Sequence, residues 1–131
     1  MTLTSFPIVV VEDNQMSQHL IAFQLKRIGF DQVMLFANGL DAVDWLADND
    51  CALLLTDCQM PGISGYEVTR RIRAREQHTG AHLAIIAITA SAMEEDKALC
   101  LQAGMDGYLA KPIQLAAIRA ALAPWMQQVV S

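Results

Sequence analysis

Five residues with charged or reactive side chains stand directly after apolar runs in this sequence. Glu12 and Asp13 follow "IVVV", Asp57 follows "LLLT", and Thr89 and Lys111 follow "IIAI" and "YLA". Three neighbouring carboxylates repel one another strongly, and a hard, oxygen-seeking cation such as Mg²⁺ keeps them ionised. Asp57 would then be a nucleophile toward phosphorus, while Lys111 and Thr89 neutralise charge on the phosphoryl oxygens. The residue types therefore indicate a metal and phosphoryl site.

Each of these residues also has a simpler interpretation when it is taken alone. Acidic residues at strand ends are common turn formers, Lys111 suits a solvated position before a helix, and Thr89 suits a helix entry. The combination of all five is much less easily explained by turns.

The chain has the alternation of elements that would bring these residues together. Short apolar runs at 8–11, 33–36, 52–55, 83–88 and 108–110 alternate with helix-like segments. This βα pattern is typical of a parallel sheet covered on both faces. In such sheets ligands bind beyond the carboxyl ends of the strands. The pattern therefore predicts an α/β fold with one site at that edge.

Start and stop signals predict where the helices lie. Asn14 is expected to cap the first helix, which Gly29 ends, and three apolar residues share one face of it: Met16, Leu20 and Phe23. Asn38 is expected to cap the second helix.

Signals for the later helices lie in the second half of the chain. Two S-x-x-E capping boxes, at 64–67 and 91–94, predict the third and fourth helices, and the polar stretch 76–79 with Gly80 indicates a loop. Pro112 suits the first turn of a last helix over 113–122, and Pro124 limits its continuation.

Composition excludes several classes of protein. The chain has 131 residues, of which 53% are hydrophobic and 18% charged, which favours one globular domain, 1–131, with its core at about 8–122. A net charge of −5 disfavours direct nucleic-acid binding, and the four arginines at 70–75 are expected to form a solvated face. Three unpaired cysteines, and no apolar stretch long enough for a membrane span, predict a cytoplasmic domain without membrane contact.

Four stretches resemble a known family. The segments "VVVEDN", "LLLTDCQMPGISGYE", "IIAITA" and "GMDGYLAKPI", in this order and spacing, look like the receiver domains of two-component response regulators. The resemblance covers about residues 8–122, and "VEDNQMSQHL" and "MDGYLAKPI" are most similar to receivers attached to hybrid sensor histidine kinases. It implies a flavodoxin-like (βα)5 three-layer sandwich whose parallel sheet has the strand order 2-1-3-4-5.

The resemblance also implies roles for the residues at the strand ends. Asp57 would be the phosphoacceptor. Mg²⁺ would be held by the Glu12, Asp13 and Asp57 carboxylates and by the backbone carbonyl of Gln59.

The resemblance implies further roles for residues that are not metal ligands or that have a second role. Lys111 would contact the phosphoryl group, and the Lys111–Pro112 peptide bond would be cis. Thr89 and Tyr108 would form a switch pair, although Tyr108 also suits a half-buried aromatic position on a short edge strand. Gln59 and Ser91 stand at positions that modulate loss of the phosphoryl group, and neither is an acid that orients water. Slow self-dephosphorylation is therefore expected.

The function implied is that of a phosphoacceptor in a two-component phosphorelay. The domain would take a phosphoryl group from a sensor histidine kinase, change its surface at the fourth helix, fifth strand and fifth helix, and, in a hybrid kinase, pass the group to a histidine phosphotransfer domain. As an isolated domain it would be a phosphoacceptor with self-phosphorylation and self-dephosphorylation activity. A stand-alone response regulator, acting by phosphorylation-dependent protein binding, remains open.

Two alternatives come from other classes. A phosphatase of the haloacid dehalogenase type also uses Asp, Mg²⁺, Thr and Lys, but it needs a second acid where this chain has Gln59. A degenerate receiver that only binds partners is disfavoured because all five strand-end residues are present.

Overall fold

The five expected strands form one parallel sheet in the computed structural model, which describes residues 6–90, 93–111 and 113–130. The strands are β1 (Ile8–Val11), β2 (Val33–Phe36), β3 (Leu53–Asp57), β4 (Ile85–Thr89) and β5 (Gly107–Ala110). Their order is β2-β1-β3-β4-β5, which confirms the 2-1-3-4-5 order. The three central strands, β1, β3 and β4, are buried along their whole length, as expected of a sheet covered on both faces.

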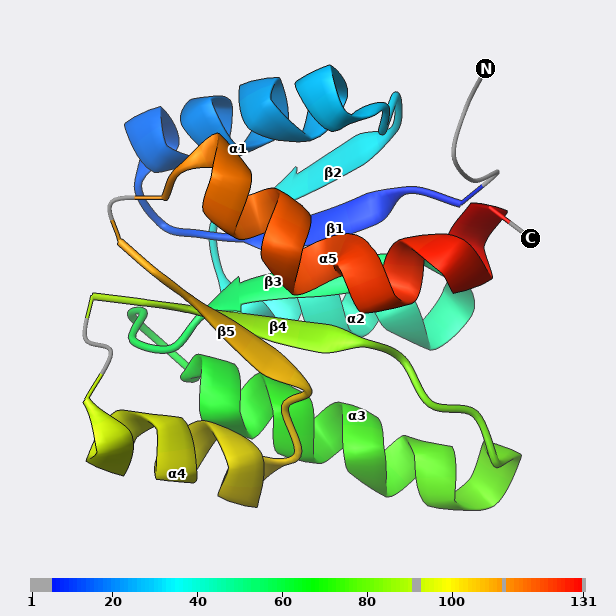
Figure 1. Ribbon diagram of the computed structural model, residues 1–131. Coiled ribbons are helices and arrows are strands. Elements are labelled where there is room, and N and C mark those ends of the chain that lie inside the picture. Colours follow the sequence, from blue (N-terminus) through cyan, green and yellow to red (C-terminus); the bar gives the residue numbers. More distant parts are fainter. Residues whose placement is uncertain (1–5, 91–92, 112, 131) are drawn as a thin grey trace.

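Helices cover the two faces of the sheet and complete three layers (Figure 1). On one face α1 (Gln15–Ile28) and α5 (Leu115–Val130) pack on residues such as Val10 and Leu55. On the other, α2 (Gly39–Asp48), α3 (Gly65–Thr79) and α4 (Glu94–Ala103) pack on residues such as Val9 and Leu54. Adjacent strand residues point to opposite faces, so each apolar strand supplies both cores. No helix within the described ranges has the length and apolar character of a membrane span.

Three predicted helix caps are confirmed. The side chains of Asn14, Asn38 and Ser64 accept hydrogen bonds from backbone N–H groups at the starts of α1, α2 and α3. Gly29 ends α1, as expected, in a conformation with φ 122°. Each polar cap satisfies an N–H group that the helix leaves unpaired, which explains why these helices begin where they do.

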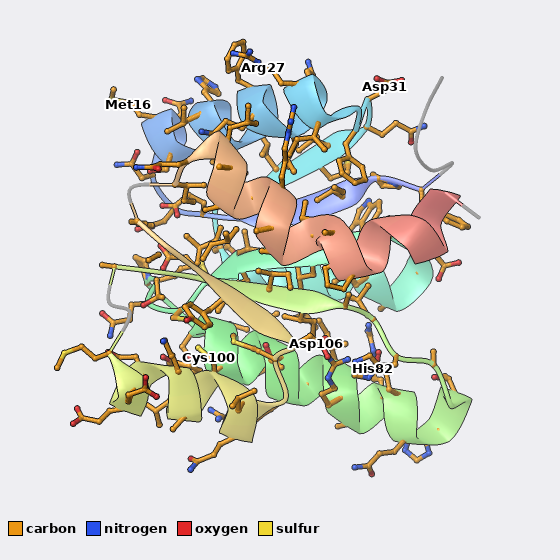
Figure 2. All side chains as sticks on the ribbon, viewed as in Figure 1. Met16, Arg27, Asp31, His82, Cys100 and Asp106 are labelled. Carbon is orange, nitrogen blue, oxygen red and sulfur yellow. The ribbon has the colours of Figure 1, made fainter. Side chains whose placement is uncertain are left out.

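The side of α1 that packs on the sheet differs from the apolar face seen in the sequence. Met16, Leu20 and Phe23 share a face, but that face is exposed, with Met16 83% accessible, and Ile21 and Leu25 are buried instead. Figure 2 shows Met16 and Arg27 on the side of α1 that points away from the sheet. The helix therefore presents apolar side chains both to the core and to solvent.

Two predicted boundaries in the second half are wrong. The polar stretch 76–79 is the last turn of α3 rather than a loop, because Gly80, with φ 75°, supplies the left-handed residue that closes the helix. Helix α4 begins at Glu94 after Met93, which makes no side-chain cap hydrogen bond. The predicted cap Ser91 lies outside the described residues.

The last helix also differs from its prediction. It begins at Leu115 and continues to Val130, so Pro124 lies inside it. A proline removes one N–H donor and crowds the preceding turn, but it does not always end a helix. Pro112 lies outside the described residues.

Arg73 joins α3 to the segment between α4 and β5. Its guanidinium lies 2.6 Å from Glu76 Oε1 and 2.8 Å from Asp106 Oδ2, and its Nε–H donates to the Gly104 carbonyl at 2.9 Å. Asp106 also lies 2.7 Å from His82 Nε2, and Figure 2 shows these two side chains side by side. Only 18% of the Arg73 side chain is exposed, so the expected solvated face of α3 does not include it.

Replacing Arg73 with methionine should lower the free energy of unfolding by about 2–3 kcal/mol, because two half-buried carboxylates would lose their cation. Urea unfolding measures the loss. Arg70→Met is the matched control, since its ion pair with Glu67 is exposed to solvent and should contribute little to stability. Equal effects of the two substitutions would contradict the role given to Arg73.

Candidate functional site

The carboxylates predicted from the strand ends lie together at one edge of the sheet. One carboxylate oxygen from each of Glu12, Asp13 and Asp57 lies within 4.8 Å of the corresponding oxygens of the other two. Glu12 and Asp13 follow β1, and Asp57 is the last residue of the neighbouring strand β3. Parallel pairing of Val11 with Thr56 brings these ends level, so residues distant in sequence meet.

Lys111 places its ammonium group against two of these acids. Its Nζ lies 3.1 Å from Asp57 Oδ2 and 3.2 Å from Glu12 Oε2. Its backbone N–H donates to the Thr89 carbonyl at 2.8 Å, which fixes the start of the segment after β5. Burial opposes the charged form, but the hydrogen bond and charge of Asp57, followed by those of Glu12, outweigh it and raise the pKa of Lys111. The lysine is therefore a permanent cation at physiological pH.

Glu12 is an acid buried at the base of the site. Its side chain is 1% exposed, and Oε1 accepts a hydrogen bond of 3.0 Å from the Asn14 N–H. Burial, and the nearby charge of Asp57, raise the pKa of Glu12, although the Asn14 bond and Lys111 act in the opposite direction. Oε2 is buried near Lys111 Nζ but receives no well-aligned hydrogen bond from the described residues. A buried carboxylate oxygen without a hydrogen-bond donor is a suitable ligand for a hard cation, and the other two carboxylates are suitable ligands as well.

A pocket of about 260 Å³ opens beside the acceptor candidate. Asp57, Thr89 and Lys111 line it, as their strand-end positions led us to expect, and so does Gln59, as the resemblance implies. Glu12 and Asp13 are not among its lining residues. The Gln59 N–H donates to Asp57 Oδ1 at 3.3 Å. Thr89 is the last residue of β4, and Asp57 pairs with the residue that precedes it.

The same pocket has lining residues that sequence reasoning missed. Tyr66 and Asp96 reach it from α3 and α4, and Cys58 follows Asp57. No spacing rule identifies the helix residues, because only the rotation of each helix decides which side chains face the pocket.

Tyr108 does not line this pocket. Tyr108 is 38% exposed, and the ammonium of Lys97, on α4, lies 4.9 Å from the centroid of its ring. The hydrogen bond with Tyr108 is the main reason for the raised pKa of Lys97. The predicted modulator Ser91 and the Lys111–Pro112 peptide bond fall outside the described residues.

The cysteines near the site carry thiols that resist reaction. Cys58 and Cys100 are buried with their sulfur atoms 4.0 Å apart, and both are free, as is Cys51. Burial, with smaller contributions from neighbouring groups, raises the pKa of Cys58 to about 12. Since the thiolate is the reactive form, Cys58 is a packing residue.

Gly65 allows α3 to start directly beside Asp57. Its N–H donates to the Cys58 carbonyl at 3.0 Å, and a β-carbon on Gly65 would overlap the backbone carbonyl of Asp57. Only glycine permits this approach.

Gly65→Ala should therefore push the end of β3 away from α3 and lower the free energy of unfolding by about 2 kcal/mol. Thermal or urea unfolding measures the change. Gly62→Ala is a useful comparison, because a β-carbon there meets no atom within 4 Å and only the φ of 85° is strained. A Gly65 variant as stable as the wild type would show that the strand end moves freely.

Comparison with known proteins identifies related sequences along nearly the whole chain. The family model for the response regulator receiver domain matches residues 8–123. The sensor histidine kinase RcsC of Salmonella typhi is 37% identical over 122 residues, which are 93% of this chain and 12% of RcsC. Hybrid signal transduction histidine kinase I of Dictyostelium discoideum is 41% identical over 81% of this chain and 6% of its own length. The chain thus spans only a small part of these relatives.

Solved structures share the same fold. One is the receiver domain of a Pseudomonas aeruginosa PAO1 sensor histidine kinase with a magnesium ion in its active site cleft. It is 39% identical with a TM-score of 0.81, covering 93% of this chain and 98% of that one. Another is a co-crystal structure of the Saccharomyces cerevisiae histidine phosphotransfer protein Ypd1 with the receiver domain of Ssk1. There the TM-score is 0.87 and the identity 28%, over 98% of this chain and 94% of that one.

Proposed function

Because this chain belongs to the family of response regulator receiver domains, we propose that it accepts a phosphoryl group from a phosphohistidine onto Asp57. The observation that carries the proposal is the meeting of three carboxylates with the Lys111 ammonium at the end of β3. We also propose that residues 1–131 form one domain with its core at about 8–122.

The chemistry proposed is an in-line displacement at phosphorus. An Asp57 carboxylate oxygen forms the new P–O bond while the P–N bond to the histidine breaks, and the released imidazole nitrogen takes a proton from water. Lys111 holds Asp57 and stabilises negative charge on the phosphoryl oxygens. The Thr89 hydroxyl is proposed to donate to the same oxygens, since Thr89 lines the pocket.

Mg²⁺ suits the donor set of this site. Glu12, Asp13 and Asp57 are proposed to hold it with the backbone carbonyl of Gln59. When bound, the ion supplies positive charge that keeps the carboxylates ionised and neutralises the transferred group.

Phosphorylation is proposed to change a surface formed by α4, β5 and α5. Thr89 would move toward the phosphoryl group and the Tyr108 ring would turn inward, which shifts the population between two packings. The exposed position of Tyr108 against Lys97 supports an outward starting state. We further propose that Gln59 and Ser91, which are not acids, leave the phosphoryl group slow to hydrolyse.

A protein is proposed as the phosphoryl donor. The exposed apolar face of α1, formed by Met16, Leu20 and Phe23, lies on the helix that begins just after Glu12 and Asp13, and it offers a surface for a protein partner. The relatives and the yeast complex favour a sensor histidine kinase or a histidine phosphotransfer domain as this partner. Both a part of a hybrid kinase and a stand-alone regulator agree with these features.

The free thiols support a cytoplasmic location, and the charge of −5 argues against nucleic acid as a direct partner.

Intact mass after incubation with acetyl phosphate tests the proposal. A single phosphoryl adduct that forms with Mg²⁺, is absent with chelator and decays over many minutes is expected. If acetyl phosphate and phosphorylated histidine kinases both leave the mass unchanged, the proposed function is wrong and a binding module without phosphorylation replaces it.

A further inference from the structure

Gln18 lies on α1 where the helix passes the ends of two strands. Its side-chain Nε2 donates a 2.6 Å hydrogen bond to the backbone carbonyl of Glu12 and lies 3.4 Å from that of Phe36. Gln18 is half-buried, one helical turn after the cap Asn14. Gln18 is therefore held beside the acidic residues by backbone contacts, although it is not itself one of the carboxylates.

The Glu12 carbonyl controls the direction in which the chain leaves β1. The Glu12 N–H donates to the Phe36 carbonyl at 3.0 Å and continues the pairing of β1 with β2 past Val11. After that bond the chain turns into α1. A peptide group is planar, so fixing the Glu12 carbonyl also fixes the N–H and Cα of Asp13. The hydrogen bond from Gln18 thus helps to fix the position of the Asp13 Cα, from which the Asp13 side chain extends.

The Glu12 carboxylate has its own, separate supports. Oε1 accepts from the Asn14 N–H, and Oε2 lies near Lys111. Neither contact reaches the Glu12 carbonyl, which Gln18 holds directly. Asp13 is exposed, so packing does not hold it either.

We propose that Gln18 is a positioning residue for the metal site, acting through the peptide bond between Glu12 and Asp13. This inference rests on the proposed function, because it requires Mg²⁺ at the acidic residues. Groups that orient metal ligands typically change metal affinity by 10–100-fold when they are removed.

Gln18→Met retains the length of the side chain and removes the amide donor. The Mg²⁺ dissociation constant of this variant, from a titration followed by amide NMR shifts, should rise about tenfold. Gln15→Met is the matched control, since Gln15 is exposed on the same helix. Its Mg²⁺ affinity should not change.

Unfolding by urea in the presence of chelator separates positioning from a role in stability. A Gln18→Met protein that binds Mg²⁺ as the wild type does overturns the inference. So does an affinity loss that is matched by a large loss of stability without Mg²⁺. If the methionine variant does not fold, Gln18→Asn, whose amide is too short to reach the carbonyl, is held to the same criteria. Failure of the wild type itself to bind Mg²⁺ would instead contradict the proposed function.

Discussion

Asp57→Asn should abolish the phosphoryl adduct formed with acetyl phosphate and Mg²⁺. The amide has nearly the same shape as the carboxylate but lacks the negative oxygen that attacks phosphorus. Asp57 is buried at the end of β3, with only 6% of the residue exposed. Because asparagine fills the same space, the substitution should leave the fold in place. Intact mass and the rate of phosphoryl transfer from a phosphorylated histidine kinase measure the loss.

A matched substitution distinguishes the acceptor from a general effect of charge. Asp44→Asn removes an exposed carboxylate on α2 and should be phosphorylated like the wild type. If Asp57→Asn still acquires a phosphoryl group with wild-type stoichiometry, the acceptor is another residue and the assignment of Asp57 is wrong.

Lys111→Met should slow phosphorylation by about 10²–10³-fold, the usual loss when a group that stabilises transition-state charge is removed. It should also lower the free energy of unfolding without Mg²⁺ by about 2 kcal/mol, because Glu12 and Asp57 would lose the cation between them. This figure is below that for a fully buried pair, since 30% of the Lys111 side chain is exposed.

The Mg²⁺ affinity of the Lys111→Met variant should change in the opposite direction to its phosphorylation rate. A positive neighbour repels the ion, so removing Lys111 should strengthen Mg²⁺ binding while it weakens catalysis. A Mg²⁺ titration, the phosphorylation rate and urea unfolding together measure these effects. Lys26→Met, an exposed lysine on α1, should change none of them. A Lys111 variant with a wild-type rate at saturating Mg²⁺ would exclude a role for the ammonium in the reaction.

Much of the site was predictable from the sequence because its residues stand at strand ends. Apolar runs identified the five strands, and parallel strands place their carboxyl ends at one edge. Glu12, Asp13, Asp57 and Lys111 could therefore be brought together without coordinates. The strand order, by contrast, followed only from the resemblance to receiver domains, since periodicity does not say which strands are neighbours.

The residues that came from helices could not be predicted in this way. Tyr66 and Asp96 in the pocket, and Gln18 against Glu12, depend on how far each helix is rotated about its axis. The same rotation decides that Ile21 of α1 is buried and Phe23 exposed, although both are apolar.

The sequence by itself determined the five strands, the caps of the first three helices and which residues stand at the strand ends, because these depend on local backbone preferences and on alternation along a strand. Tertiary structure alone decided which face of α1 meets the core, how Arg73 joins α3 to Asp106, and that α5 continues past Pro124. Those outcomes depend on contacts between segments far apart in the chain, where packing and ion pairing outweigh local preference.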